Sequence, residues 1–274
     1  MSKKKSPYKV NTFLLGLLPF VVVAVIWSFM VHIVKIPQIF LPPLEDMPKV
    51  LWHMFTQENI FADLWISICR VVLGFFIAII ISTPLGILMG YSEKMSRLFD
   101  PIIGFIRYMP VPVFIPLTIL WVGSGNTQKM VIIFLGAFFQ LVLMVEDAAK
   151  SVRKDFYESA MMLGAPKRDL VLRVLWPAAF PQIFDSYRIC IGWAWTYLVV
   201  AEIVGATTGI GYYIIKAQRY LLVPQIFAAM VLIGLLGMFT DIFLAKLHKR
   251  LFPWEEKQKN MKYRLRREHG KFNK

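Results

Sequence analysis

Long apolar runs constrain the fold of this chain more than any other feature. Residues 13–34 and 64–90 are almost entirely apolar, and a run of about 20 such residues is long enough for a helix to cross a bilayer. Within lipid, a helix satisfies all of its own backbone hydrogen bonds. Hydrophobic residues make up 57% of the 274 residues, with a mean hydropathy of +0.58, which exceeds the needs of a soluble domain. The chain is therefore expected to be an all-α integral membrane protein.

Six membrane spans are expected within a single transmembrane domain at residues 13–251. Prolines, glycines and charged residues separate the apolar runs, and three prolines also interrupt the third run. The first run is not followed by a small-residue cleavage site, so it is interpreted as a retained helix and not as a signal peptide. The predicted spans are residues 13–34, 64–90, 99–122, 128–145, 183–203 and 224–247.

Basic residues predict the orientation of these spans. The segments 1–12, 91–98, 149–182 and 246–274 contain 23 of the 31 Lys and Arg residues, whereas the segments on the opposite side contain five. Because cytoplasmic loops are enriched in Lys and Arg, both termini are expected in the cytoplasm. The basic tail at residues 252–274 is expected to lie near anionic membrane lipid. A net charge of +14 arranged by membrane side, without one aromatic-laced basic patch, argues against nucleic-acid binding.

A charged segment at residues 146–181 lies between two apolar runs. Residues 155–163 contain good helix formers, and Gly164 can adopt the left-handed conformation that often closes a helix. Pro166 suits the first turn of a second helix and pushes Ala165 into the bend. A helix, a sharp turn and a second helix are therefore predicted.

The second helix of this segment carries apolar residues at helical spacing, with basic residues on its other side. We expect Pro177 and Pro181 to end it, because proline lacks the backbone donor that a helix interior requires. The prediction is a compact helical hairpin outside the bilayer.

This hairpin segment resembles the EAA loop of ABC-importer permeases. In that loop a Glu-Ala-Ala sequence is followed by three variable residues, a glycine and, further on, a closing proline. Ser159 stands where that family usually has alanine. In the family, the loop is a coupling helix that docks into a groove of the ATP-hydrolysing subunit. The resemblance implies that the following residues couple the chain to an ATPase: Glu158, Ser159, Ala160, Gly164, Ala165 and Pro177.

The resemblance extends from about residue 41 to residue 251. The sequences at 67–75, 83–90, 115–123 and 201–212 resemble the branch of binding-protein-dependent permeases that serves nitrate, taurine, aliphatic sulfonates and bicarbonate. Related members of this branch transport thiamine precursors or riboflavin. The resemblance therefore implies an importer subunit for a small anionic solute, with a thiamine-precursor or riboflavin-like solute as an alternative.

The resemblance also implies partners. Two ATPase subunits, a second and identical permease copy, and an external substrate-binding protein would complete a multi-pass assembly in the bacterial cytoplasmic (inner) membrane. No phosphate-binding Gly-x-x-x-x-Gly-Lys-Ser/Thr motif is present in the sequence, so ATP and Mg²⁺ are expected on the partner, with no cofactor or catalytic site on this chain. An ion-gradient-driven transporter and a scaffold subunit of a membrane enzyme complex remain alternatives.

Charged residues within the apolar runs are candidates for the translocation pathway, because a charge at mid-bilayer costs roughly 2.5–3.5 kcal/mol on insertion scales and needs a partner or a cavity. Arg107 lies beside prolines, where a cation would suit an anionic solute. A structural pair or a carbonyl-bound arginine is the alternative for Arg107. For Arg70 and Arg188 a structural role is the favoured interpretation, and Asp185 is the expected partner of Arg188. Glu202 would either gate the external mouth or cap a re-entrant turn.

Aromatic and sulfur-containing side chains are interpreted more simply. Trp193 and Trp195 are expected to be interfacial anchors or packing residues. Cys69 and Cys190, the two cysteines of the sequence, are expected to pack inside apolar spans.

Overall fold

A computed structural model describes residues 8–255 of the chain. These residues form helices and no β-strand, which confirms the all-α prediction. The basic residues predicted to flank the domain at 1–7 and 256–274 lie outside the described residues. The helices are α1 (Tyr8–His32), η1 (Leu44–Asp46), α2 (Met47–Thr56), α3 (Ile60–Tyr91), α4 (Glu93–Ile106), η2 (Val111–Phe114), α5 (Ile115–Val122), α6 (Asn126–Lys150), α7 (Lys154–Met162), α8 (Lys167–Asp169), η3 (Leu170–Leu175), α9 (Trp176–Ile203), α10 (Ile210–Arg219) and α11 (Val223–Leu251).

The described chain divides into two compact units. The first comprises residues 8–61 together with Tyr213–Leu232, and the second comprises Ala62–Tyr212 together with residues 233–255. In the first unit, the Trp27 ring packs edge-on against Phe227, with the centroids 5.0 Å apart, and its indole N–H donates to the Pro42 carbonyl at 2.8 Å. Aromatic packing and one hydrogen bond therefore tie distant parts of the first unit together.

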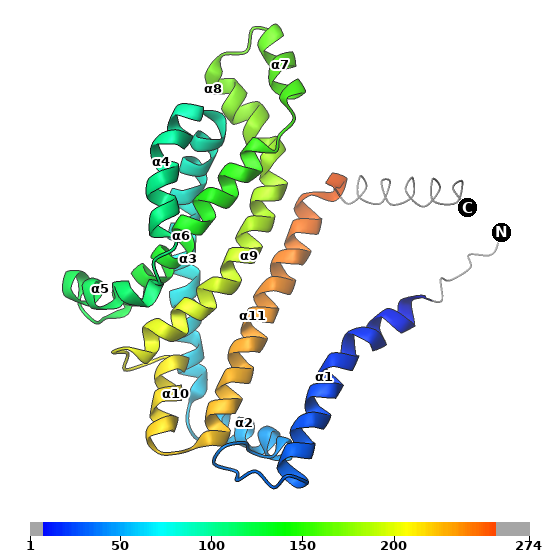
Figure 1. The fold of residues 1–274 in the computed structure, drawn as a ribbon, viewed down its shortest axis with the longest axis vertical. Helices are drawn as coiled ribbons and strands as arrows, with labels where there is room; N and C mark the ends of the chain where they lie inside the picture. The colour runs from blue at the N-terminus through cyan, green and yellow to red at the C-terminus, as the bar shows by residue number, and fades with distance from the viewer. Residues whose placement is uncertain (1–7, 256–274) are drawn as a thin grey trace, which may run out of the picture. The chain divides into compact units, whose positions relative to one another are not determined.

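The second unit is built on the pair α6 and α9, which lie side by side along their lengths (Figure 1). Their facing residues form one apolar core with residues of α3. Glycines of α3 allow a close approach to α6: a Cβ atom on Gly86 would lie 2.6 Å from the Val142 carbonyl oxygen, and one on Gly90 would lie 2.4 Å from the Cβ of Ala149. Small residues at such contacts let helix backbones pack closely in membranes.

Four helices of the described chain are long and apolar enough to cross a membrane: α1 from Leu15 to His32, and the whole of α3, α6 and α11. The bent pair of α4 with the segment Val111–Val122 would make a fifth span if both parts count as one. Helix α9 has 28 residues but is not among the four, since residues such as Arg188 and Glu202 interrupt its apolar sequence. The number of six spans and the cytoplasmic termini therefore stay predictions.

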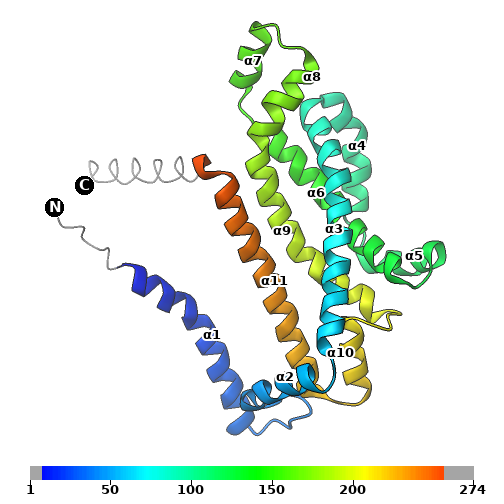
Figure 2. The ribbon, with the colours of Figure 1, turned by 180° about the vertical axis from the view of Figure 1, so that it is seen from behind.

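The third predicted span is not one continuous helix. Helix α4 ends at Ile106, and the chain then bends by 88° into η2 and α5; α5 extends sideways from the end of α4 (Figures 1 and 2). Pro110 and Pro112 explain the break, because each lacks a backbone donor and disfavours helical geometry in the residue before it. The break leaves Arg107 at the end of a helix.

Two loop boundaries also differ from the prediction. The basic segment at residues 91–98, which separates the second and third predicted spans, is mostly helical: α3 ends at Tyr91 and α4 begins at Glu93, so only Ser92 lies between the two helices. The hairpin segment was expected to begin at residue 146, but α6 continues to Lys150 and buries the Glu146 side chain, which accepts a hydrogen bond from Ser96 at 2.7 Å. Burial with a polar partner thus extends the helix beyond the apolar run.

The hairpin contains the predicted turn, but its second helix does not end at the prolines. Gly164 adopts a φ of +79° between α7 and α8, as its position predicts. The prediction that Pro177 and Pro181 end the second helix was wrong, because the helix continues through both into α9. Residues Leu170–Leu175 form a π-helical stretch, in which the Trp176 N–H bonds to the Val171 carbonyl five residues back. This wider turn accommodates the missing donor of Pro177.

Candidate functional site

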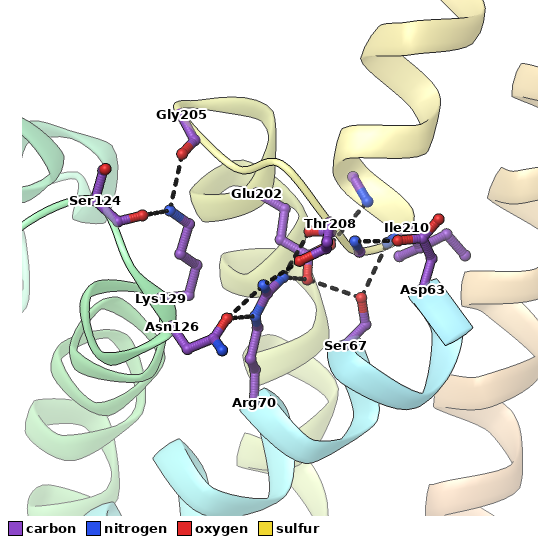
Figure 3. Close-up of polar contacts among 12 residues, drawn as sticks. Asp63, Ser67, Arg70, Ser124, Asn126, Lys129, Glu202, Gly205, Thr208 and Ile210 are labelled. Carbon is purple, nitrogen blue, oxygen red and sulfur yellow. Dashed lines mark hydrogen bonds and ion pairs between the residues drawn. The ribbon is translucent and has the colours of Figure 1, made fainter. Parts of the chain in front are cut away.

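A buried polar cluster surrounds Arg70 (Figure 3) at the end of α9 that is distant from the hairpin (Figure 1). The Arg70 guanidinium donates to Glu202 Oε1 at 2.6 Å, to the Thr208 carbonyl at 2.8 Å and hydroxyl at 2.9 Å, and twice to Asn126 Oδ1, at 2.6 and 3.0 Å. A guanidinium has five N–H groups, so these bonds use all of them. Arg70 thus has no free donor to offer a solute.

Glu202 joins the loop before α10 to α3. Its Oε1 also accepts from the Ser67 hydroxyl at 2.7 Å, and its Oε2 accepts from the Gly211 backbone N–H at 2.8 Å. Gly209 has a φ of +108°, and a Cβ there would lie 2.3 Å from Glu202 Oε1, so the loop can pass this close to the carboxylate only with glycine. Of the two roles considered for Glu202, this geometry fits the cap of a turn.

Two further side chains complete the cluster. Asp63 accepts from the Gly209 N–H at 2.6 Å, and Lys129 donates to the Ser124 carbonyl at 2.5 Å and the Gly205 carbonyl at 3.1 Å (Figure 3). The Lys129 side chain is buried, and two basic and two acidic groups balance the formal charge of the cluster. Such mutual pairing is how buried charges are tolerated.

Arg107 has a different environment. It lies at the break after α4, is exposed, and lines a cavity of about 650 Å³ between this break, α6 and α9. Its guanidinium donates to the Tyr108 hydroxyl at 2.9 Å and lies over the Tyr108 ring at 4.8 Å. Among the described residues, no carboxylate forms an ion pair with Arg107. Of the four predicted pathway residues, Arg107 therefore has the donors most available to a ligand.

Arg188 pairs across helices. It donates to Asp241 of α11 through Nε at 2.5 Å and Nη2 at 3.0 Å, a bidentate geometry. The predicted pair with Asp185 was wrong, since the Asp185 carboxylate instead lies 3.7 Å from the His248 imidazole. Arg188 therefore links α9 to α11, and the structure does not bring it together with Arg70, Arg107 or Glu202 through any described hydrogen bond.

The hairpin presents the predicted coupling residues at the opposite end of α9 (Figure 1). Glu158, Ser159, Gly164 and Pro177 are exposed, and Ala160 and Ala165 are half-buried. The Ala165 N–H donates to the Ala160 carbonyl at 3.1 Å, which closes the turn. Exposed residues on a short, ordered hairpin form a surface that a second protein can contact.

A second cavity, of about 380 Å³, lies beside Glu158. Gly90, Lys150 and Tyr157 also line it, so the ends of α3 and α6 meet the hairpin here. Burial raises the pKa of the Tyr157 phenol. The base of the hairpin therefore contains both polar groups and unfilled space.

Together these features define a multi-pass α-helical membrane protein with a broken span, a cavity beside the break and an exposed helical hairpin. Residues 82–253 match the family of binding-protein-dependent transport system inner membrane components. The chain belongs to that family.

Relatives and a solved structure agree with this membership. An ABC transporter permease protein of Methanocaldococcus jannaschii is 35% identical over 94% of this chain and 98% of its own length. The taurine transport system permease protein TauC of Escherichia coli is 31% identical over 85% and 86%, and further relatives at 30% identity are named for aliphatic sulfonate, nitrate and bicarbonate transport. The fold is similar to a chain of the inward-facing MetNI methionine ABC transporter, with a TM-score of 0.64 at 21% identity, covering 71% of this chain and 96% of that chain.

Several residues of these sites were not singled out from the sequence. Asn126, Lys129 and Asp241 are hydrogen-bond partners of distant residues, and Gln140 lines the larger cavity. Trp193, which was expected to be an interfacial anchor or a packing residue, also lines this cavity. Trp195, in contrast, is buried and donates to the Thr240 hydroxyl at 3.2 Å, as expected of a packing residue. The one available signal was that Gln140 lies in the middle of an apolar run, where an amide needs a partner or a cavity.

Proposed function

We propose that this chain is the membrane-spanning permease subunit of an ATP-driven importer. The hairpin of α7 and α8 is its coupling element, and the observation that carries this proposal is the ordered, exposed turn at Gly164, which lies between helices α6 and α9 of a chain in this family. Gly164 permits the bend and Glu158 contributes to the surface that contacts the ATPase.

The proposed assembly contains two copies of this chain, two ATPase subunits on the hairpins and an external substrate-binding protein that delivers the solute. ATP and Mg²⁺ bind to the ATPase, and this chain carries no catalytic site. ATP binding draws the hairpins together and opens the pathway outward, and hydrolysis resets it. The assembly lies in the cytoplasmic membrane with the hairpin and both termini in the cytoplasm.

The proposed solute is a small anion. Relatives named for taurine, aliphatic sulfonates, nitrate and bicarbonate support this class. Arg107 supports it independently, because an exposed guanidinium that lines a cavity without a carboxylate partner attracts negative charge.

Co-purification tests the proposal. The tagged chain would be purified gently from its native membrane as wild type and as Gly164→Val, and bound proteins would be identified by mass spectrometry. Valine is strained at a φ of +79°, so the mutant should insert normally but lose most of a bound protein that carries a phosphate-binding loop.

Gly123→Val is the matched control. Gly123 has a φ of +77° and, like Gly164, would place a Cβ atom in open space, but it lies in the turn between α5 and α6. This variant should retain the ATPase. The proposal fails if the wild-type chain purifies without an ATPase, or if both variants lose it equally; uptake that collapses with an uncoupler at constant ATP would instead indicate a gradient-driven transporter.

A further inference from the structure

We propose that the cavity beside Arg107 binds an organic anion, with a sulfonate or carboxylate group at the α4 break and a compact apolar body against α9. This inference rests on the proposed transport function and adds the site within this chain and the part of the solute that each wall contacts.

The charge of the cavity is positive on one side. Arg107 lies where α4 ends, and the described residues that line the cavity include no Asp or Glu. The only hydrogen bond that the Arg107 guanidinium makes within the described chain is to the neutral Tyr108 hydroxyl, so its charge is not neutralised there by the protein. Because the surroundings are apolar, an anion that entered would be attracted more strongly than in water.

Helix α6 contributes one polar side chain, Gln140, to the lining of the same cavity. Gly136, Gln140 and Met144 recur at four-residue spacing on α6 and so share one face of the helix, and all three line the cavity. The Gln140 side chain is exposed and, within the described residues, no hydrogen bond occupies its amide. It is therefore available to donate to an oxygen of the same anion.

The third wall, on α9, is aromatic. Cys190, Trp193 and Tyr197 lie on one face of α9, and the Trp193 side chain is 56% exposed although it lies within the helix. Gly136 provides the room for Tyr197, since a Cβ at Gly136 would lie 2.3 Å from its ring. The aromatic rings thus offer an apolar surface to a ligand and do not pack fully against the protein.

The size of the cavity selects the class of anion. Its volume of about 650 Å³ lies within the range of about 300–1,000 Å³ that is typical of small-molecule pockets. An inorganic anion of four or five atoms at Arg107 would leave most of this space, and both aromatic rings, without contacts. An anion with an aliphatic or aromatic body fills the space and buries apolar surface against Trp193.

Cysteine labelling tests the site directly. The full-length Gln140→Cys protein in nanodiscs would be reacted with two thiosulfonate reagents of similar size, one carrying a sulfonate and one a trimethylammonium group. Labelling of the parent protein, which retains Cys69 and Cys190, gives the background. Leu163→Cys, exposed on the hairpin, gives the intrinsic rate ratio of the two reagents away from Arg107.

Relative to that ratio, the sulfonate reagent should be favoured roughly tenfold at position 140 because of the nearby unpaired cation. Arg107→Gln should abolish the preference and Arg107→Lys should retain it. Toluenesulfonate should slow the labelling at concentrations where nitrate does not, and Trp193→Ala should remove this protection.

A rate ratio equal to that at position 163, or one that Arg107→Gln leaves unchanged, would overturn the anion site. Equal protection by nitrate and toluenesulfonate would overturn the organic class of ligand. Labelling needs no ATPase, so the site and the importer function fail separately: loss of the preference refutes the site, whereas absence of an ATPase in the purified complex refutes the function.

Discussion

Replacement of Glu202 by glutamine should destabilise the protein strongly, although the two side chains have nearly the same shape. The substitution removes the charge opposite the buried Arg70, and the new amide N–H₂ faces a donor in either orientation: the Gly211 N–H on one side, or Arg70 and Ser67 on the other. Removal of one partner of a buried ion pair costs about 3–5 kcal/mol in soluble proteins. We expect about 3 kcal/mol, because an unfolded membrane protein retains some polar partners.

Glu93→Gln is the matched control. The Glu93–Arg97 pair has the same 2.6 Å separation as the Glu202–Arg70 pair, but its side chains are 77% and 78% exposed, compared with 0% and 4%. Exposed pairs contribute about 0–1 kcal/mol. Unfolding of each variant by sodium dodecyl sulfate in mixed micelles would give both changes in free energy. Equal losses of stability in the two variants would refute the idea that burial increases the free-energy cost of removing the Glu202 charge.

Two further predictions concern helix contacts. Gly86→Ala should lower the free energy of unfolding by about 1–3 kcal/mol through overpacking against α6, whereas Gly104→Ala, where a Cβ meets no atom within 4 Å, should not; equal effects in a thermal-unfolding assay would show that α3 and α6 do not pack as described. Arg188→Met should be more destabilising alone than together with Asp241→Leu, because the double variant leaves no charge unpaired. A double-mutant cycle in the same micelles that gave no coupling energy would exclude the α9–α11 ion pair.

Local sequence rules were sufficient for the helical class and for the turn. The long apolar runs determine the helices α1, α3, α6 and α11. The turn at Gly164 follows because a backbone in the left-handed conformation favours glycine. The same rules failed at Pro177, because a π-helical stretch shifts the hydrogen-bond register before the proline. That shift depends on how the helix packs, which the local sequence does not encode.

The polar sites depended on long-range pairing. Arg70 and Glu202 are separated by 132 residues and Arg188 and Asp241 by 53, so a rule about neighbours on one helix could only suggest the wrong partner, Asp185. Arg107 was identified because its position beside prolines is itself a local signal. Gln140, and the place of Trp193 in the cavity lining, became recognisable only when three segments were brought around one cavity.

The helical path through α8, η3 and α9 is uninterrupted, so the second arm of the hairpin and Glu202 lie on one continuous helical rod. At about 1.5 Å per residue, the residues from 167 to 203 extend on the order of 50 Å. An inserted or deleted residue anywhere along this rod would turn its two ends relative to each other by about 100°. The length of this segment is therefore constrained wherever it keeps α-helical geometry, which the π-helical stretch at Leu170–Leu175 locally departs from.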